Sequence, residues 1–366
     1  MNKLTRVVRW SIEPKGEPIL TQFLCFYPSS PIWAVDALTD LNWLPRDGHR
    51  PESDKGERFR AGMSQPVMTY ESDTYTLILC RDGRFMLRVD ALERRIAGLN
   101  LVESFHETVG LWGEYLDFVN ALYLLFDSAL LEASNISLFT LNELTRRDVF
   151  REVIEGGRTT SEVLPTESVV SYYQKCRYIS DYQQDLPLSS DGRIFRRMLA
   201  PETSVRLAFD NFEKVMARPG TEKVLASYSK GLSEYKIGNY ETAVVLSWFI
   251  IEAAVVGIWK RHIDGMNRDM EGGTRRINAE RRKFLTGRDF TLSMISQLLE
   301  LWDVLPNDLF KSVDAVRQTR NAIVHRSATS ISAEQTQLAL NTAKEMIGRE
   351  SQITIPVNLG LSVMGL

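Results

Sequence analysis

The chain has 366 residues, of which 44% are hydrophobic and 25% charged, and its formal net charge is −3. This length allows two or three domains, and the composition is that of an ordinary soluble globular protein. The balance excludes a protein that attracts nucleic acid through overall positive charge. Residues 222–350 nevertheless hold 18 Lys and Arg against 16 Asp and Glu, whereas the rest holds 26 against 31, so the C-terminal part is slightly basic.

The three cysteines lie far apart, in no spacing typical of a metal site. We therefore expect reduced thiols in a cytoplasmic protein with no metal and no other cofactor. The N-terminus has no apolar signal region. The longest apolar run, residues 243–259, is interrupted by Ser247, Glu252 and Gly257. A central Glu is costly in lipid, so this run predicts a buried helix and no membrane span.

The first hundred residues are typical of mixed α/β structure. Four runs have strand-like alternation or apolar stretches bounded by turn residues: residues 6–14, 18–28, 68–80 and 84–92. Asp82-Gly83 stands between the last two runs, which predicts a hairpin. The charged, Gly-rich segment 45–63 is expected to be a loop.

The middle of the chain turns helical. Apolar residues recur at three- and four-residue spacing from Ser104 to Ala133, which predicts a helix. A second helix is expected over Leu141–Ile154, and Gly156–Ser168 then breaks the pattern. Val169–Tyr182 fits a strand or a helix equally well. A loop over residues 185–192 and a helix over Ile194–Met216 follow.

Arg218-Pro219-Gly220 marks the expected boundary between an α/β domain (residues 1–218) and an all-helical domain (residues 219–350), because Pro and Gly together stop a helix. The expected fold class is therefore α+β. Thr221 is predicted to cap the first of five helices, which cover Glu222–Tyr235, Tyr240–His262, Leu292–Trp302, a stretch from Pro306 that contains Arg320–His325, and Ser332–Ile347. The first two flank Gly238-Asn239 and should be antiparallel neighbours. Residues 264–290 form a long connection, and residues 351–366 an apolar tail expected to pack on the fold.

The fourth helix places an arginine among apolar residues. At about 100° per residue, one face collects Leu309, Val313, Val316, Ile323 and Val324. Arg320 falls within this face, where an unpaired charge is costly. Glu252 is a lone charge on the apolar second helix, so a Glu252–Arg320 ion pair is expected in a shared core. Such a pair either takes part in the function or only stabilises the helical bundle. Asn321 and His325, four residues apart, project together from the edge of the face.

The segment Arg320–His325, RNAIVH, resembles the R-x4-H signature of the HEPN family (higher eukaryotes and prokaryotes nucleotide-binding), including the polar residue after the Arg. The helical order over residues 221–350 is similar to that of the family, and Leu246–Ala253 resembles its second helix. The resemblance covers about a third of the chain. It implies an all-helical, commonly dimeric bundle, of which many members are metal-independent ribonucleases.

The three polar residues suit RNA cleavage. RNA carries its own nucleophile, the 2′-hydroxyl, so the reaction needs a base and a cation for the charge that develops at phosphorus. His325 suits the first role and Arg320 the second, while Asn321 would orient the phosphate or the imidazole. One motif supplies one histidine, so the family's homodimer predicts a composite cleft built from two copies. The alternative for His325 is a surface histidine hydrogen-bonded to a neighbour.

Residues 275–288 carry six basic side chains against the single acid Glu280. Clustered Lys and Arg attract phosphates, which makes this segment a candidate RNA contact, although a solvated loop explains the same composition. The basic residues are Arg275, Arg276, Arg281, Arg282, Lys283 and Arg288.

These features predict a metal-independent endoribonuclease that leaves cyclic-phosphate ends and is regulated by residues 1–218. An N-terminal sensor joined to a C-terminal HEPN unit is similar to bacterial abortive-infection and antiphage effectors, which implies a phage-derived trigger. The alternative is a non-catalytic dimerisation module that binds nucleotide or RNA. A third hypothesis is a toxin that a partner antitoxin neutralises.

Overall fold

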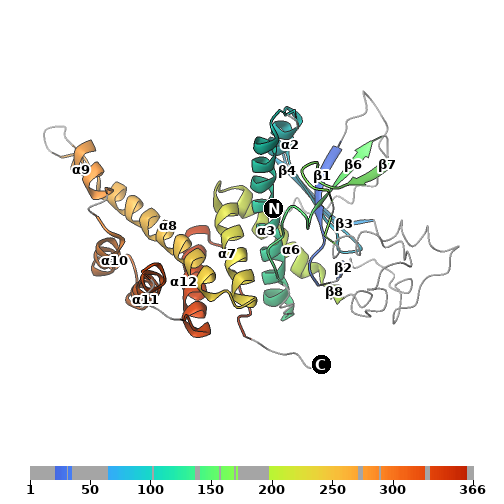
Figure 1. The fold of residues 1–366 in the computed structure, drawn as a ribbon. Helices are drawn as coiled ribbons and strands as arrows, with labels where there is room; N and C mark the ends of the chain where they lie inside the picture. Colours follow the sequence, from blue (N-terminus) through green and yellow to red (C-terminus); the bar gives the residue numbers. More distant parts are fainter. Residues whose placement is uncertain are drawn as a thin grey trace. The chain divides into compact units, whose positions relative to one another are not determined.

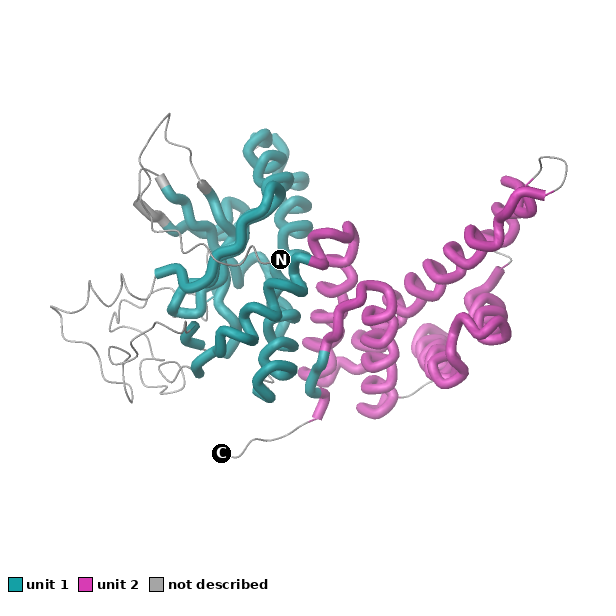
Figure 2. Tube along the Cα trace, turned by 180° about the vertical axis from the view of Figure 1, so that it is seen from behind, with its two compact units in different colours: residues 1–213, 356–358 teal, residues 214–355, 359–366 magenta. Residues whose placement is uncertain are grey.

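The computed structural model describes residues 21–30, 32–34, 65–100, 103–136, 141–155, 158–168, 170–171, 198–270, 275–287, 290–325 and 330–360. The chain divides into two compact units, residues 1–213 with 356–358 and residues 214–355 with 359–366 (Figure 2). Unit 1 contains an antiparallel sheet and unit 2 is helical (Figure 1), so the fold class is α+β, as expected. The division falls within helix α6, shortly before the Arg218-Pro219-Gly220 turn.

The sheet of unit 1 has six strands in the order β3-β4-β5-β1-β6-β7 among the described residues, and every neighbouring pair is antiparallel. Its strands are β1 (Thr21–Phe26), β3 (Pro66–Glu71), β4 (Tyr75–Cys80), β5 (Phe85–Val89), β6 (Phe150–Glu155) and β7 (Arg158–Glu162). Two short strands, β2 (Ile32–Ala34) and β8 (Met198–Ala200), pair in parallel.

The predicted hairpin at Asp82-Gly83 is confirmed, because β4 and β5 pair across it. The backbone N–H of Cys80 donates to Arg84 O at 2.9 Å, which closes the turn. Gly83 has a φ of +84°, and a Cβ at this position would lie 2.6 Å from Ile32 Cγ1. Both the conformation and the space therefore require glycine.

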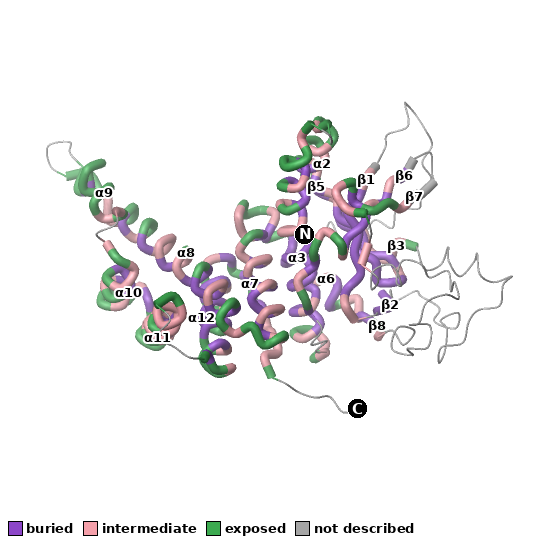
Figure 3. Tube along the Cα trace, viewed as in Figure 1, coloured by how far each residue is buried: buried purple, intermediate pink, exposed green. Residues whose placement is uncertain are grey.

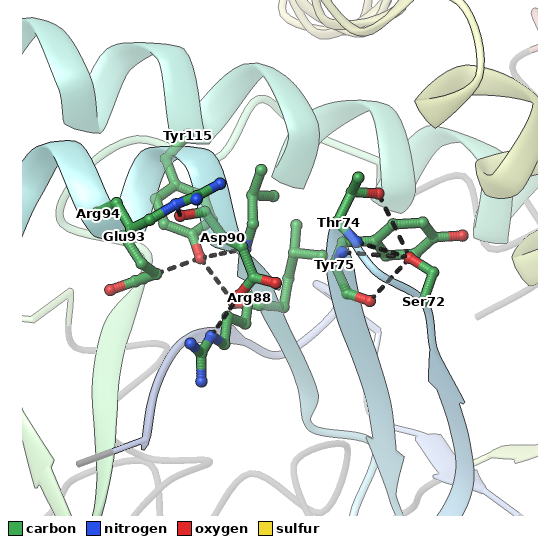
Figure 4. Close-up of polar contacts among 10 residues, drawn as sticks. Ser72, Thr74, Tyr75, Arg88, Asp90, Glu93, Arg94 and Tyr115 are labelled. Carbon is green, nitrogen blue, oxygen red and sulfur yellow. Dashed lines mark hydrogen bonds and ion pairs between the residues drawn. The ribbon is translucent and has the colours of Figure 1, made fainter. Parts of the chain in front are cut away.

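The run 68–80 is not one strand, because a tight turn separates β3 from β4. Ser72 Oγ accepts hydrogen bonds from the N–H groups of Thr74 (3.3 Å) and Tyr75 (3.2 Å) (Figure 4). The side chain thus completes a turn without the Gly or Pro that usually identifies one in a sequence. The next run also ends earlier than expected, since β5 stops at Val89 and helix α2 (Asp90–Ala97) follows.

The helix expected over Leu141–Ile154 is wrong. Its second half forms β6, which lies between β1 and β7, so pairing with strands distant in sequence outweighs local helix preference. The segment Gly156–Ser168, expected only to break a pattern, contains β7. The helix expected from Ile194 begins later, as α6 (Glu202–Met216), and β8 precedes it. The predictions for 6–14, 45–63 and 185–192, and nearly all of Val169–Tyr182, lie outside the described residues.

Helix α3 (Phe105–Ser134), which was predicted, covers one face of the sheet. The Phe85 and Phe126 rings meet at 5.0 Å. Tyr115 is fully buried, and its hydroxyl accepts the Val89 N–H at 2.9 Å and lies 3.0 Å from Glu93 Oε1 (Figure 4). Aromatic packing and one buried hydroxyl therefore fix α3 against β5.

The opposite face of the sheet holds charged groups inside the core. Arg84 is 7% exposed, and its guanidinium pairs with the carboxylate of Glu152, which is 1% exposed. Tyr27 donates its hydroxyl to Asp82 Oδ2 at 2.8 Å, and Asp82 Oδ1 accepts the Arg84 backbone N–H at 3.1 Å. We call Tyr27, Asp82, Arg84 and Glu152 the buried charge network, in which each charge has an internal partner.

All five predicted helices of unit 2 are present, and a short one, α9, lies within the expected connection. Their bounds are α7 (Thr221–Lys236), α8 (Tyr240–Met266), α9 (Ala279–Leu285), α10 (Leu292–Leu301), α11 (Asn307–Val324) and α12 (Ala333–Ser351). The prediction that Thr221 caps α7 is wrong, because Thr221 is already helical and Gly220, with a φ of +92°, precedes it. Gly238, with a φ of +87°, ends the turn between α7 and α8.

Helix α8 is the core of unit 2, and α7, α10, α11 and α12 all pack against it (Figures 1 and 3). Among the described residues it is the one helix long and apolar enough to cross a membrane, by length and composition only. Ile251 and Val255 are fully buried and Ser247 is nearly so. These residues form the buried side of the helix, as its sequence predicted.

Helix α12 begins with a capping box, since Ser332 Oγ accepts the Gln335 N–H and the Gln335 side chain accepts the Ser332 N–H. It extends to Ser351, slightly beyond the expected end. In the tail that follows, Ile353 and Ile355 are buried. The described part of the tail thus packs on the fold, as expected from its apolar composition.

Candidate functional site

Helix α11 carries the candidate site at its C-terminal end. Leu309, Val313 and Val316 form the buried stripe that the sequence predicted. The stripe does not continue to the end of the helix, because Arg320 is half-buried and Val324 is 52% exposed. Arg320 therefore lies where the helix leaves the core, and not in the middle of a buried face.

The structure brings Arg320 and Asn321 together. Arg320 Nη1 donates to Asn321 Oδ1 at 3.1 Å. His325 is the exposed C-cap residue of α11, and its backbone N–H donates to Asn321 O at 3.0 Å. All three residues thus lie at the C-terminal end of one helix. His325 is exposed to solvent, and the Asn321 amide oxygen accepts a hydrogen bond from the Arg320 guanidinium.

The expected Glu252–Arg320 ion pair is wrong. Within the described residues, neither an ion pair nor a hydrogen bond joins these two side chains. The reason is that Glu252 and Arg320 are both half-buried. A charge that keeps contact with water does not need an opposite charge to offset its desolvation, which was the premise of the pairing.

Asp314, six residues before Arg320 on α11, already accepts hydrogen bonds from two neighbouring side chains. Arg317 donates to Asp314 Oδ1 from Nη2 at 2.6 Å and from Nε at 3.0 Å, and Gln318 donates to Asp314 Oδ2 at 2.7 Å. The hydrogen bonds from Arg317 lower the pKa of the Asp314 carboxyl below its usual value. Asp314 is therefore neutralised locally, and Arg320 keeps a positive charge that an anionic ligand can reach.

The basic segment lies at the C-terminal end of α8, and part of it forms a helix where a loop was the alternative. Arg281, Arg282 and Lys283 are exposed on the short helix α9, and Arg275 and Arg276 are exposed just before it (Figure 3). Arg288 lies outside the described residues. Sequence reasoning missed five aromatic rings beside this segment, Trp259, His262, Phe284, Phe290 and Trp302, although Phe284 lies within the basic cluster and Phe290 closely follows it.

The two cysteines within the described residues are free and buried. Burial raises the pKa of the Cys25 thiol well above its usual value and that of Cys80 to about 12. Neither thiol is therefore a nucleophile at neutral pH. In the same part of the chain, no group of three or more His, Cys, Asp or Glu is placed to hold a metal ion.

Arg320 and Asn321 are hydrogen-bonded to each other near the C-terminal end of α11, and His325 is exposed at the C-cap. A guanidinium can bind an anion, and an imidazole can exchange a proton. Comparison of the chain with family models, with curated proteins and with solved structures finds no match. The resemblance to the HEPN signature rests on residues 320–325 and on the order of the helices.

Proposed function

We propose that this protein is a metal-independent endoribonuclease of the HEPN type, with Arg320, Asn321 and His325 as its catalytic residues. One observation carries the proposal. Within the described residues Arg320 has no carboxylate partner, and it lies beside Asn321 and five residues before the exposed His325. A guanidinium left uncompensated next to an exposed imidazole suits an anionic substrate that requires proton transfer.

The reaction would proceed by attack of the 2′-oxygen of RNA on the adjacent phosphorus. His325 accepts the 2′-hydroxyl proton as the new O–P bond forms. The bond from phosphorus to the 5′-oxygen breaks, and that oxygen takes up a proton. The products are a 2′,3′-cyclic phosphate and a 5′-hydroxyl. Arg320 would stabilise the charge on the non-bridging oxygens, and Asn321 would hold the guanidinium in place.

Two proton transfers are needed, and each copy of the motif has one histidine. A homodimer would supply the second His325, with a cleft built from both copies of the three residues. Full activity from a strictly monomeric form would contradict it.

The test is cleavage of RNA by the purified full chain in EDTA. The wild type should produce cyclic-phosphate ends, and His325→Ala should lower the rate by about 10²-fold or more. His106→Ala, which removes an exposed histidine of unit 1, is the matched control and should leave the rate unchanged. Cleavage that survives His325→Ala at the wild-type rate would refute the assignment.

A second candidate is an RNA- or nucleotide-binding module without turnover. It is favoured by the His325 ring, since no hydrogen bond holds the imidazole within the described residues. Catalytic histidines usually have a partner that fixes the ring and its tautomer. This candidate predicts binding without products, and equal toxicity of the wild type and Arg320→Ala in cells.

The biological setting belongs to the same proposal. An endoribonuclease acts where RNA is abundant, and the buried free thiols of Cys25 and Cys80 suit the reducing cytoplasm. Unit 1 would regulate the activity in response to a phage-derived trigger, or an antitoxin would hold the enzyme inactive. Toxicity on expression that disappears in His325→Ala would support an effector role.

A further inference from the structure

Five rings form a continuous row at the end of unit 2 that carries α9. Phe284 meets Phe290 edge-on at 5.6 Å, and Phe290 stacks on Trp259 at 5.5 Å. Trp259 stacks with Trp302 at 5.9 Å, with 6° between the planes, and Trp302 stacks with His262 at 5.0 Å. We call Phe284, Phe290, Trp259, Trp302 and His262 the aromatic row. It joins α8, α9 and the end of α10.

Part of the aromatic row is buried, whereas Phe284 at one end and Trp302, which precedes His262 at the other end, are exposed to solvent. Trp259 is buried, and its Nε1–H donates to Leu285 O at 2.8 Å, which ties α9 to α8. In contrast, Phe284 is 56% exposed and Trp302 is 42% exposed. Both ring partners of Trp302 come from α8, one turn apart, so α8 covers one side of the indole. Two large rings therefore remain in water at fixed positions, held by the rings behind them.

Basic side chains surround the exposed end formed by Phe284. Five cations are exposed over residues 275–287 against the single acid Glu280. Two of them have acidic partners, Arg282 with Asp264 at 2.8 Å and Arg275 with Asp269 at 3.9 Å, but exposed pairs of this kind are weak and exchange readily. Arg276 and Lys283 have no ion pair within the described residues. The surface thus combines stacking rings with free positive charge.

We propose that the aromatic row and the basic residues of α9 form an accessory site for an unpaired stretch of RNA, separate from the cluster at His325. Bases would stack on Trp302 and Phe284, while Arg276 and Lys283 would contact phosphates. The choice of RNA rests on the proposed function, and the choice of a nucleic acid over a protein rests on charge complementarity. Unpaired bases offer free ring faces, whereas bases in a duplex are already stacked.

The accessory site lies far from the candidate catalytic residues. Helix α11 begins shortly after Trp302, and His325 caps its other end. Its 18 residues span about 27 Å at about 1.5 Å per residue. RNA bound at Trp302 would therefore reach His325 only through several intervening nucleotides. Loss of Trp302 should weaken the binding of long unpaired RNA and leave a dinucleotide substrate unaffected.

Binding is best measured with the full chain carrying His325→Ala, so that the probe stays intact. The probes are a fluorescent oligouridylate of about 12 nucleotides and a blunt RNA duplex of similar length. Trp302→Ala and Phe284→Ala should each weaken oligouridylate binding by about 5- to 150-fold, which corresponds to about 1–3 kcal/mol per stacked base. Trp302→Phe should retain most of the affinity. Leu301→Ala removes a neighbouring apolar side chain that is 71% exposed and serves as the control.

Charge reversal gives an independent readout. Arg276→Glu and Lys283→Glu should each reduce the slope of log affinity against log salt by about 0.7, since each removes one phosphate contact. Circular dichroism and thermal unfolding of every variant establish that the fold is intact. If either Trp302→Ala or Phe284→Ala unfolds, the other variant supplies the test.

Unchanged affinity in both Trp302→Ala and Phe284→Ala would overturn the proposal, as would equal affinity for the duplex and the single strand. Self-association that is lost in Trp302→Ala, without any effect on RNA binding, would identify a second copy of the chain as the occupant and would also overturn it. The two proposals fail separately. If the wild type cleaves RNA and Trp302→Ala binds normally, only the accessory site is wrong, whereas stacking-dependent binding without cleavage refutes only the catalytic assignment.

Discussion

Units 1 and 2 each place an arginine next to apolar residues, and they treat its charge in opposite ways. Arg84 of unit 1 is buried and pairs with an equally buried carboxylate, Glu152. Arg320 of unit 2 is half-buried, and its hydrogen bond goes to a neutral amide, that of Asn321. The comparison separates two uses of charge. A buried arginine requires an internal anion, whereas an arginine at the end of a core helix keeps its charge available for a ligand.

The largest effect is expected in unit 1. Arg84→Met removes one partner of the buried pair and leaves Glu152 with an uncompensated charge in the core. This should lower the free energy of unfolding by about 3–5 kcal/mol. Arg320→Met, the same change in unit 2, should lower it by less than about 0.5 kcal/mol, because the site is partly exposed. Urea unfolding of both variants measures the difference.

The double variant Arg84→Met/Glu152→Leu sharpens this result. Removal of both charges replaces an ion pair with apolar packing, which is often neutral or stabilising. The double variant should therefore recover most of the stability that Arg84→Met loses. Equal losses for Arg84→Met and Arg320→Met would show that the two arginines are used alike, against the comparison.

The reverse pattern is expected for activity. Arg320→Met should reduce the rate of RNA cleavage by about 10²- to 10³-fold, because it removes the group that stabilises the charge at phosphorus. Arg320→Lys keeps the charge but loses the planar donor pair, so it should retain part of the rate. Lys311→Met, which removes an exposed charge on the same helix, is the matched control and should cleave at the wild-type rate. A similar loss in Lys311→Met would point to damage of the helix as the cause.

The candidate site of unit 2 could be proposed from the sequence more readily than the charge network of unit 1, for a physical reason. Arg320, Asn321 and His325 lie within one helix, so the period of the helix alone relates their positions. Arg84 and Glu152 lie 68 residues apart and meet only because β6 pairs with β1. Leu141–Ile154 was predicted as a helix, which hid that strand and with it the partner of Arg84.

The wrong prediction of a Glu252–Arg320 ion pair also arose because tertiary packing cannot be read from the period of one helix. The apolar neighbours of Glu252 on α8 predicted burial, but the depth of a residue on a core helix depends on which neighbouring helices cover that side, which the period does not specify. The rings of the aromatic row come from α8, α9, the α9–α10 connection and the end of α10, and their stacking also depends on tertiary packing. Local features, such as the Ser332 capping box and the Asp82-Gly83 hairpin, do not depend on it.

The smallest effect concerns Asp314, a half-buried counterpart of Glu152. The hydrogen bonds from Arg317 lower the pKa of Asp314, so the folded protein holds this proton less tightly than the unfolded chain. The stabilisation is therefore fully present above the unfolded pKa of about 3.9 and is lost as the pH falls through the folded pKa. Because both side chains keep contact with water, we expect only a few tenths of a kcal/mol.

Asp314→Asn should remove this contribution, so that the stability difference between wild type and variant shrinks as the pH drops from about 5 to about 2. Urea unfolding across this range at low and high salt measures it, and salt should reduce the difference. The result bears directly on the comparison of the two units. A loss approaching that of Arg84→Met would mean that the charges of α11 are coupled into the core. Arg320 would then have to be regarded as a structural residue, and the case for a free cation at the candidate site would fail.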